Sequence, residues 1–577
     1  MCFSKILSMR YLVCFIISFN SAYYFSQVVS KENLSAQETL FWDFNRTQIQ
    51  ATGCYYKDAL ETTDQKHGKW VYFDRYGQIE EERNYYKDML QGKVTLFFPN
   101  KKIRQEGYFI LGKQDSVYRE YYENGKLSLE GFYRLNSPTG RWTYYYLDGR
   151  QKSVEELKDG QSHIWSFWLP DSLHTQTIVE GTGEMATYHT NGTVKEWYNF
   201  RNGLKDGPFE EISVYGYTTL KGFFKEGEKD STWTYAYYTG DIEKISNYRN
   251  GKLHGAYTYY YDNGKVNVSG SYSEGQKSGK WSWYTNKGTT DMEGEFQQDQ
   301  QHGDWTYYYP TGELSYKAHF EKDKKTGHWT YFYRDGSRFK EGDFANDQKE
   351  GTWSTWYENG TLLMSGAYKD GKETGEWINN WDNGKLKNKS SFKNGVLDGE
   401  WISAYSNGKT KLTGTYENGF QTGEWIEYFD NGKQKDIVTY KVFKEKSKID
   451  YGIMKDRERL ESKKDGHAVS FSSKDFGKTE EGDYKEGLKE GEWIAYHPGG
   501  KVPAVISNYK NGELDGSMKQ FDRRGKLLQE MEYKDGLKHG KFIIYDKKGG
   551  VLVEKTFENG FEVIKGQENK PGSFSPR

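Results

Sequence analysis

Cysteine is nearly absent from this chain of 577 residues, which has three, and only Cys54 lies beyond the extreme N-terminus. A lone cysteine excludes an intramolecular disulfide framework and a cysteine-ligated zinc site. Aliphatic residues are scarce too, because hydrophobic residues make up 35% of the chain and aromatic residues, at 17%, are about half of these. Stability must therefore come mainly from the packing of aromatic side chains.

The chain also lacks an excess of charge of either sign. It has 81 Lys and Arg against 83 Asp and Glu, spread along the whole sequence. No basic stripe is present that would predict binding to nucleic acid or to an anionic membrane surface. The balanced charge therefore identifies no partner and argues against binding to nucleic acid.

Long apolar runs are missing except near the N-terminus, where Lys5 and Arg10 lead into YLVCFIISF, residues 11–19. This run is too short to span a bilayer, and small or polar residues follow it, as in a signal peptide. Residues 1–26 are therefore predicted to be an export signal, which places the mature chain in the periplasm, the cell envelope or outside the cell. An uncleaved anchor is the alternative, if the apolar segment extends to Phe25.

What the chain does have is aromatic residues in a regular repeat. It contains 49 Tyr, 32 Phe and 18 Trp, far more than a disordered chain carries. The stretch HGDWTYYYPTG (302–312) is followed by TGHWTYFYRDG and EGTWSTWYENG, each 24 residues further on. The 24-residue spacing holds for the first small residue of eleven units: Gly183, Gly207, Ser231, Gly255, Gly279, Gly303, Gly327, Gly351, Gly375, Gly399 and Gly423. Looser copies begin at Gly68, Gly92, Asp115, Gly140, His163, Gly466, Gly491, Gly516 and Gly540, so there are about twenty units. Such a period predicts a solenoid in which each unit buries its apolar face against its neighbours.

Each unit is predicted to be a β-hairpin. With the anchor residue as position 0, a Trp stands at position 2, an aromatic residue at 6, Asn-Gly or Asp-Gly at 8 and 9, a small residue at 15 and an aromatic residue at 17. Asn-Gly between two aromatic runs is typical of a type I′ turn, in which both central residues have positive φ. The predicted fold is all-β: an extended solenoid of tandem hairpins that form one long, twisted antiparallel sheet.

The turn also predicts register and faces. A two-residue loop at positions 8 and 9 places position 2 opposite position 15, so Trp329 should face Gly342, as Trp353 faces Gly366 and Trp401 faces Gly414. By strand parity, Trp305, Tyr309 and Phe320 should then share one buried aromatic layer. A bulged loop would overturn that parity.

Position 5 falls on the other face and carries a row of rings: Tyr260, Tyr284, Tyr308, Phe332, Trp356 and Tyr428. Two interpretations stand. Aromatic residues favour strands, so the row is first of all expected to be half-exposed cover for the sheet. A continuous aromatic row is also the usual centre of an interface, so the same six residues are the candidate partner-binding stripe.

The repeat also predicts the domain boundaries. Residues 27–60 form an N-terminal cap or linker, residues 61–433 the main array, and residues 466–562 the C-terminal repeats. Residues 434–465 interrupt the period as an insertion or hinge, with a short polar helix expected around Met454–Lys464. Residues 563–577 are a tail.

The motif pattern resembles a known family. YKDGKETGEWINNW (368–381) and YENGFQTGEWIEYF (416–429) are similar to the MORN repeat, and in particular to its bacterial variant known as the YwqK-type antitoxin family. The resemblance covers about residues 55–560. It implies scaffolding, dimerisation or proximity to membrane lipid, as in eukaryotic MORN arrays, or a toxin as partner, as in the bacterial variant.

No catalytic, metal or cofactor site is predicted. His67, His254, His302 and His539 each precede an anchor residue, where other units have Asp, Thr, Glu or Ser, which marks a variable loop position. Successive units do not supply a ladder of histidines for a metal. Gly477-Lys478-Thr479 ends like a phosphate-binding loop but lacks its earlier glycine and its βαβ context.

These observations favour a non-enzymatic, exported repeat protein that serves as a protein-binding or cell-envelope scaffold, with an envelope component as partner. The first alternative is an antitoxin or immunity protein that binds a toxin. The second is an envelope protein that binds or acts on polysaccharide, with the aromatic stripe as sugar platform. The sequence leaves open the partner, the oligomeric state and the source organism.

Overall fold

The computed structural model describes residues 30–158, 160–446 and 458–564. They fall into two compact bodies, which divide between Gln276 and Lys277. The predicted signal peptide and nearly all of the predicted tail lie outside the described residues. Apart from the short 3-10 turn η1 (Lys31–Asn33), the regular structure described in both bodies is β-strand.

The N-terminal body contains β1 (Glu38–Phe41), β2 (Ile49–Lys57), β3 (Thr62–Phe73), β4 (Ile79–Tyr86), β5 (Met89–Leu90), β6 (Gly92–Phe97), β7 (Ile103–Ile110), β8 (Lys113–Tyr121), β9 (Leu127–Arg134), β10 (Ser137–Tyr145), β11 (Gln151–Lys158), β12 (Gln161–Trp168), β13 (Gln176–Val179), β14 (Thr182–Tyr188), β15 (Val194–Arg201), β16 (Leu204–Ile212), β17 (Thr218–Lys225), β18 (Glu228–Ala236), β19 (Ile242–Arg249), β20 (Lys252–Tyr260) and β21 (Val266–Ser273).

The C-terminal body contains β22 (Gln276–Tyr284), β23 (Thr290–Gln297), β24 (Gln300–Tyr308), β25 (Leu314–Glu321), β26 (Lys324–Phe332), β27 (Arg338–Ala345), β28 (Gln348–Trp356), β29 (Leu362–Lys369), β30 (Lys372–Asn380), β31 (Leu386–Lys393), β32 (Val396–Ala404), β33 (Thr410–Glu417), β34 (Phe420–Tyr428), β35 (Gln434–Lys446), β36 (Glu458–Phe471), β37 (Lys478–Lys485), β38 (Leu488–Tyr496), β39 (Pro503–Lys510), β40 (Glu513–Phe521), β41 (Leu527–Lys534), β42 (Leu537–Tyr545), β43 (Val551–Glu558) and β44 (Phe561–Glu562).

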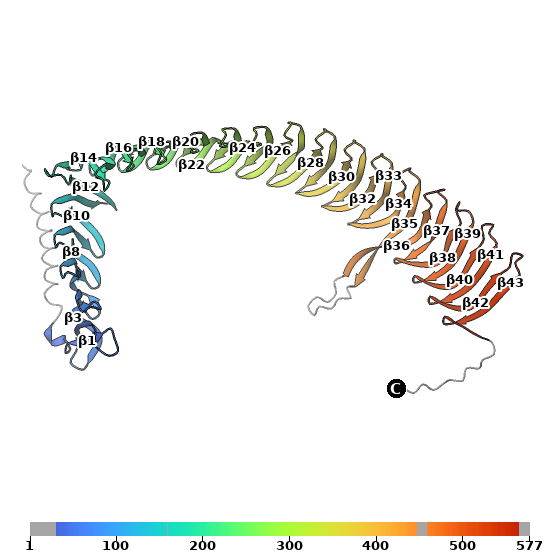
Figure 1. The fold of residues 1–577 in the computed structure, drawn as a ribbon, viewed down its shortest axis with the longest axis horizontal. Helices are drawn as coiled ribbons and strands as arrows, with labels where there is room; N and C mark the ends of the chain where they lie inside the picture. The colour runs from blue at the N-terminus through green and yellow to red at the C-terminus, as the bar shows by residue number, and fades with distance from the viewer. Residues whose placement is uncertain (1–29, 159, 447–457, 565–577) are drawn as a thin grey trace, which may run out of the picture. The chain divides into compact units, whose positions relative to one another are not determined.

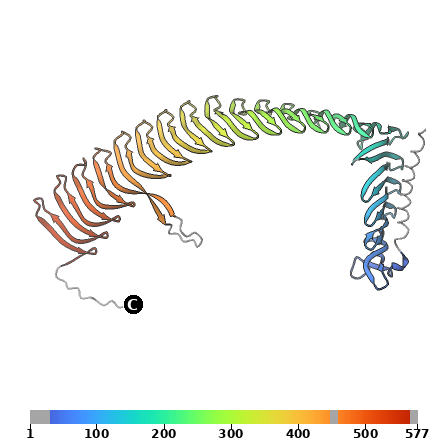
Figure 2. The same cartoon turned by 180° about the vertical axis from the view of Figure 1, so that it is seen from behind.

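Strands adjacent in the chain pair antiparallel, as β26 with β27 and β27 with β28, except that β5 and β6 both pair with β4; the 44 strands belong to one open sheet. Within each body the hairpins follow one another side by side in chain order (Figure 1, Figure 2). The predicted all-β fold of tandem hairpins in one long antiparallel sheet is confirmed.

The hairpin turn at positions 8 and 9 differs from the prediction. In the unit of Gly327, the Gly336 N–H donates to the Tyr333 carbonyl over 3.0 Å, and only Gly336 of the predicted pair has a positive φ, +85°. The connection is a β-turn closed by a glycine bulge, so a type I′ turn is wrong here. Asp335 serves the turn through its side chain instead, because its Oδ1 accepts the Ser337 N–H over 2.8 Å.

The type I′ turn occurs at the other end of each hairpin, between one unit and the next. Asn346 and Asp347 have φ values of 48° and 69°, and Asp370 and Gly371 have 49° and 75°. This turn matches the twist of the flanking strands, which suits a connection repeated along the whole sheet.

The predicted register is confirmed up to position 4. Trp329 pairs with Gly342, and the same pairing recurs at Trp353 and at Trp401. The ring that covers each glycine, however, belongs to the following unit: a Cβ on Gly342 would lie 2.2 Å from the ring of Trp353. Because the strand of the following unit bulges at this point, its Trp lies over the preceding hairpin and joins the two units.

The tryptophan rings form the core. Trp305 is 1% exposed and packs in one layer with Phe320 and Trp329, as predicted. Tyr309 does not join that layer, because the register shifts after Tyr307 and Tyr309 begins the turn. Its hydroxyl donates to the Phe332 carbonyl of the next unit over 2.8 Å. Position 4 supplies the missing rings, among them that of Tyr307.

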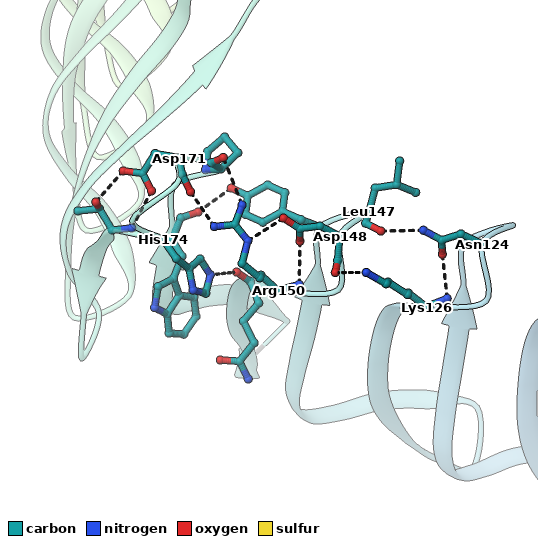
Figure 3. A network of polar contacts seen from close by, with 12 residues as sticks. Asn124, Lys126, Leu147, Asp148, Arg150, Asp171 and His174 are labelled. Atoms are coloured by element: carbon teal, nitrogen blue, oxygen red, sulfur yellow. Dashed lines mark hydrogen bonds and ion pairs between the residues drawn. The ribbon is translucent and has the colours of Figure 1, made fainter.

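The turns of neighbouring units are joined by a ladder of side-chain hydrogen bonds. In the N-terminal body, Asn124 Nδ2 donates to the Leu147 carbonyl over 2.8 Å, and Lys126 Nζ donates to the Asp148 carbonyl (Figure 3). Arg150 continues the ladder with its Nη1 on the Asp171 carbonyl over 2.7 Å (Figure 3). The Asn of the Asn-Gly pair thus both shapes its own turn and holds the next one.

Residues 434–465 are also strand where the structure describes them. β35 and β36 form a long hairpin whose pairing extends beyond Tyr440–Lys464, and the sheet continues on both sides of it. The predicted helix around Met454–Lys464 is therefore wrong over residues 458–464, and residues 454–457 lie outside the described part. Figure 1 shows this hairpin projecting from the row at β36.

One loose anchor was placed a residue too early. Ser116, with φ +69°, pairs with Tyr133 in the way that Gly92 pairs with Phe109, so Ser116 rather than Asp115 is the anchor.

Candidate functional site

The six residues of the predicted stripe each end the first strand of a hairpin, and all six are half-buried. Tyr260 lies in the N-terminal body and the other five in the C-terminal body. Tyr284, Tyr308, Phe332 and Trp356 occupy four successive hairpins. Asn380 and Ala404 then stand at the same position before Tyr428 restores the ring.

The Tyr308 hydroxyl of this stripe, and the Tyr121 hydroxyl at the same position of a looser unit, each contact a carboxylate at position 14 of the preceding unit. Tyr308 Oη lies 3.5 Å from Glu293 Oε1, and the same contact spans 3.0 Å between Tyr121 and Glu106. Burial and then the neighbouring Glu106 carboxylate raise the pKa of Tyr121 to about 12. These two hydroxyls are thus held by contacts within the chain, which leaves the ring faces available to a partner.

Ion pairs flank the stripe on the same face. Lys280 Nζ lies 2.8 Å from Glu293 Oε2, and Lys389 Nζ lies 2.6 Å from Glu376 Oε2. Each pair crosses one hairpin between positions 1 and 14. Exposed pairs of this kind contribute about 0–1 kcal/mol each, so they set the polarity of the face more than its stability.

The stripe is longer than the six predicted residues. Position 5 also carries a ring at Phe73, Phe97, Tyr121 and Tyr145 in the N-terminal body, and at Phe471, Tyr496, Phe521 and Tyr545 in the C-terminal body. The looser copies of the repeat hid these members, although counting from each anchor would have found them.

The opposite face holds a second pattern that the sequence reasoning missed. A lysine often stands two residues before the anchor, and its Nζ lies over the Trp ring at position 2, at 3.8 Å from the ring centroid for Lys489 and 5.3 Å for Lys325. Cation–π contacts favour this placement. The recurring Lys was a visible signal, but a solvated loop explained it equally well.

A cavity of about 350 Å³ interrupts the tryptophan face in the C-terminal body. Ala468 stands there at position 2, between Trp425 and Trp493 of the flanking units. Smaller cavities of about 240 and 280 Å³ lie at Val94 and Met518, which also replace Trp. In these three units a smaller side chain stands where the repeat has tryptophan.

Two of the histidines before the anchors, His67 and His254, have a structural role that Asp and Glu share. Here the side chain accepts the backbone N–H of the turn between units: His254 Nδ1 accepts from Glu274, and Glu350 Oε2 accepts from Asp370. Burial lowers the pKa of His67, whose Nδ1 accepts the Lys87 N–H. Among the described residues, no three His, Cys, Asp or Glu side chains are grouped so that they could hold a metal ion.

This geometry defines an all-β protein of tandem hairpin repeats joined by interlocking tryptophans. The MORN repeat variant matches eight segments: residues 90–110, 114–134, 253–274, 301–322, 349–370, 373–394, 421–441 and 514–535. The chain therefore contains MORN repeats of this variant type in these segments.

Other comparisons add little. No curated protein sequence matches the chain. Among solved structures, TcdB2-TccC3 is 11% identical with a TM-score of 0.12, and the match covers 92% of this chain and 32% of that one. A Photorhabdus luminescens Tc holotoxin pore with a TccC3 mutation is 13% identical with a TM-score of 0.13, covering 92% and 30%. The chain spans about a third of the length of these structures, and TM-scores this low support no conclusion about its fold or function. Within the part of the chain described, no helix is both long and apolar enough to cross a membrane.

Proposed function

We propose that this protein is a non-enzymatic, exported scaffold that binds a protein partner of the cell envelope. The observation that carries the proposal is the repetition of one aromatic position, Tyr284, Tyr308, Phe332 and Trp356, on four successive hairpins. Each ring is half-buried and fixed by the sheet, so a partner meets an ordered row. Weak contacts repeated along a row add through avidity.

The decisive experiment replaces these four residues by Ser and measures partner capture from envelope extract by the mature chain. We expect capture to fall at least about tenfold, because each lost ring removes one contact of a multivalent set. A matched control also introduces Ser, at Phe339 and Val396. These two residues are 39% and 44% exposed and lie off the stripe. Equal capture by both variants, with circular dichroism unchanged, would remove the stripe from the proposal.

Export is tested separately by cell fractionation of the tagged full-length chain. The apolar run at residues 11–19 supports export, and the mature protein is expected in the periplasm, the envelope or the medium. Recovery of the mature protein from the cytoplasm alone would contradict the scaffold.

An antitoxin of the YwqK type is the competing proposal, supported by motifs such as YENGFQTGEWIEYF (416–429). It predicts a single toxin that is lethal only when this chain is absent. Co-expression of the chain with the product of a neighbouring gene, with growth as readout, separates the two proposals.

A further inference from the structure

In several units three groups surround the tryptophan, and we call these groups the aromatic clasp. For Trp353 these are the aromatic residue at position 17 of the preceding unit, the one at position 17 of its own unit, and the lysine before its anchor. Phe344 and Tyr368 meet the indole edge to face, with centroid distances of 5.0 and 6.4 Å. Lys349 Nζ lies 4.9 Å from the ring centroid.

The unit that begins at Gly466 keeps the clasp without the ring. Tyr440, Tyr484 and Lys464 occupy the three surrounding positions and all line the 350 Å³ cavity, while Ala468 replaces the tryptophan. Lys464 Nζ remains 5.0 Å from the Tyr484 ring, the arrangement it would have beside an indole.

The other two cavities lack this arrangement. The residues before their anchors that correspond to Lys464 are Leu90 and Leu514, so neither has the clasp lysine. Of the three described cavities on the tryptophan face, the one at Ala468 is the largest and has all three clasp groups.

Three carboxylates line this cavity. Glu427 stands at position 4, and Asp436 and Glu480 stand opposite position 4 on their partner strands. Asp436 Oδ1 accepts the Ser470 hydroxyl over 2.6 Å, Glu427 Oε1 lies 2.8 Å from Lys435 Nζ, and Glu480 pairs with Lys489. A carboxylate has about four acceptor positions, so these oxygens retain capacity for a further donor.

Val438 distinguishes this cavity from an ordinary tryptophan site. Glycine stands at that position beneath Trp353, where any Cβ would lie 2.2 Å from the ring. A ring in the cavity must therefore sit farther from the sheet than a repeat tryptophan does.

We propose that this cavity binds a planar aromatic ring that carries an N–H or O–H donor, of the indole or phenol type. Tyr440 and Tyr484 meet the ring at its sides, Lys464 lies over its face, and Asp436 or Glu480 accepts its hydrogen bond. The site lies on the face opposite the aromatic stripe, so a test of this site does not depend on the scaffold proposal.

The test titrates indole into the full-length protein and follows binding by ligand-observed NMR. We expect saturable binding that is lost in the double variant Val438→Gly/Ala468→Trp, which restores the ordinary repeat and fills the cavity. 1-Methylindole, which lacks the donor, is expected to bind at least about fivefold more weakly, because the acceptors are then left unmatched. Undiminished binding in the double variant would overturn the site, and equal binding of the two probes would overturn the hydrogen bond.

A second pair of variants leaves the cavity open. Lys464→Met should weaken indole binding about two- to fivefold, whereas Lys349→Met, at the same position of a filled clasp, should not change it. Equal effects of the two substitutions would contradict the assignment. Methyl α-glucopyranoside serves as the polyol probe, and its binding in place of indole would overturn the aromatic ligand class.

Discussion

Two hairpins of the C-terminal body share the same surroundings and differ at the centre. Trp353 fills its clasp, and its Nε1–H donates to the Asp343 carbonyl of the preceding unit over 3.0 Å. Ala468 leaves its clasp open, yet its strand β36 still pairs with β35 on one side and with β37 on the other. In an array where each unit contacts only its neighbours, one unit can lose its ring while the adjoining interfaces hold it in place. The surroundings of the clasp are therefore set by the repeat, and the ring is a separable contribution to stability.

The largest expected effect comes from converting the filled clasp into an open one. Trp353→Ala should destabilise the adjoining hairpins by about 3–5 kcal/mol, because it removes a buried indole and leaves a cavity. Hydrogen exchange measured by mass spectrometry across residues 338–380 reads this out as lost protection. The same substitution at exposed Phe339 is the control. A loss below about 1 kcal/mol would show that the ring is not what joins the two units.

A smaller effect is expected from the glycine beneath the ring. Gly342→Ala places a Cβ 2.2 Å from Trp353 and should cost about 1–3 kcal/mol through overpacking. In the Trp353→Ala background the clash is absent, so the cost should nearly vanish, and a double-mutant cycle measures the difference.

Gly336→Ala is the matched control for this cycle. Gly336 has φ +85° and nothing within 4 Å of its would-be Cβ, so its cost arises from backbone conformation alone. That cost should be the same with and without Trp353. If Gly342→Ala behaved likewise, the inter-unit contact would not explain the glycine.

The sequence predicted the hairpins, their period and the Trp–Gly register, because these depend on local turn residues and strand parity. It misplaced the type I′ turn, since Asn-Gly at positions 8 and 9 also suits a turn closed by a bulge at Gly336. That bulge shifts the parity and removes Tyr309 from the core. The sequence also could not show which unit supplies the ring over each glycine, because the bulge that brings Trp353 over Gly342 follows from pairing between units.

The candidate site was predicted only in part. Position 5 was recognised at the six residues from Tyr260 to Tyr428 and missed at Tyr188 and in the looser units. The open clasp was not foreseen, because Ala468 is unremarkable as a single residue and becomes informative only when Tyr440, Tyr484 and Lys464 are seen around it.

The contribution of a clasp lysine to stability is expected to depend on whether a tryptophan ring fills the clasp. Lys349→Met should cost about 0.5–1 kcal/mol, since Lys349 Nζ contacts both the Trp353 and the Tyr368 rings. Lys464→Met should cost less, because only the Tyr484 ring lies beneath it. Local hydrogen exchange on either side of each lysine compares the two, and an equal loss at both would show that the indole adds nothing to the cation.

The smallest effect is a shift in ionisation. Burial raises the pKa of Tyr440 and of Tyr484 above the ordinary tyrosine value. Their neutral forms therefore contribute stability that is fully present below about pH 10, the unfolded value, and is lost as pH rises through the folded pKa. Filling the clasp with Val438→Gly/Ala468→Trp buries both hydroxyls further and should move both pKa values upward. Tyrosinate absorbance, as a difference titration against Tyr440→Phe and Tyr484→Phe in each background, measures the shift. A downward movement would mean that the introduced indole does not enter the clasp, and the likeness between Trp353 and Ala468 would then stop at the backbone.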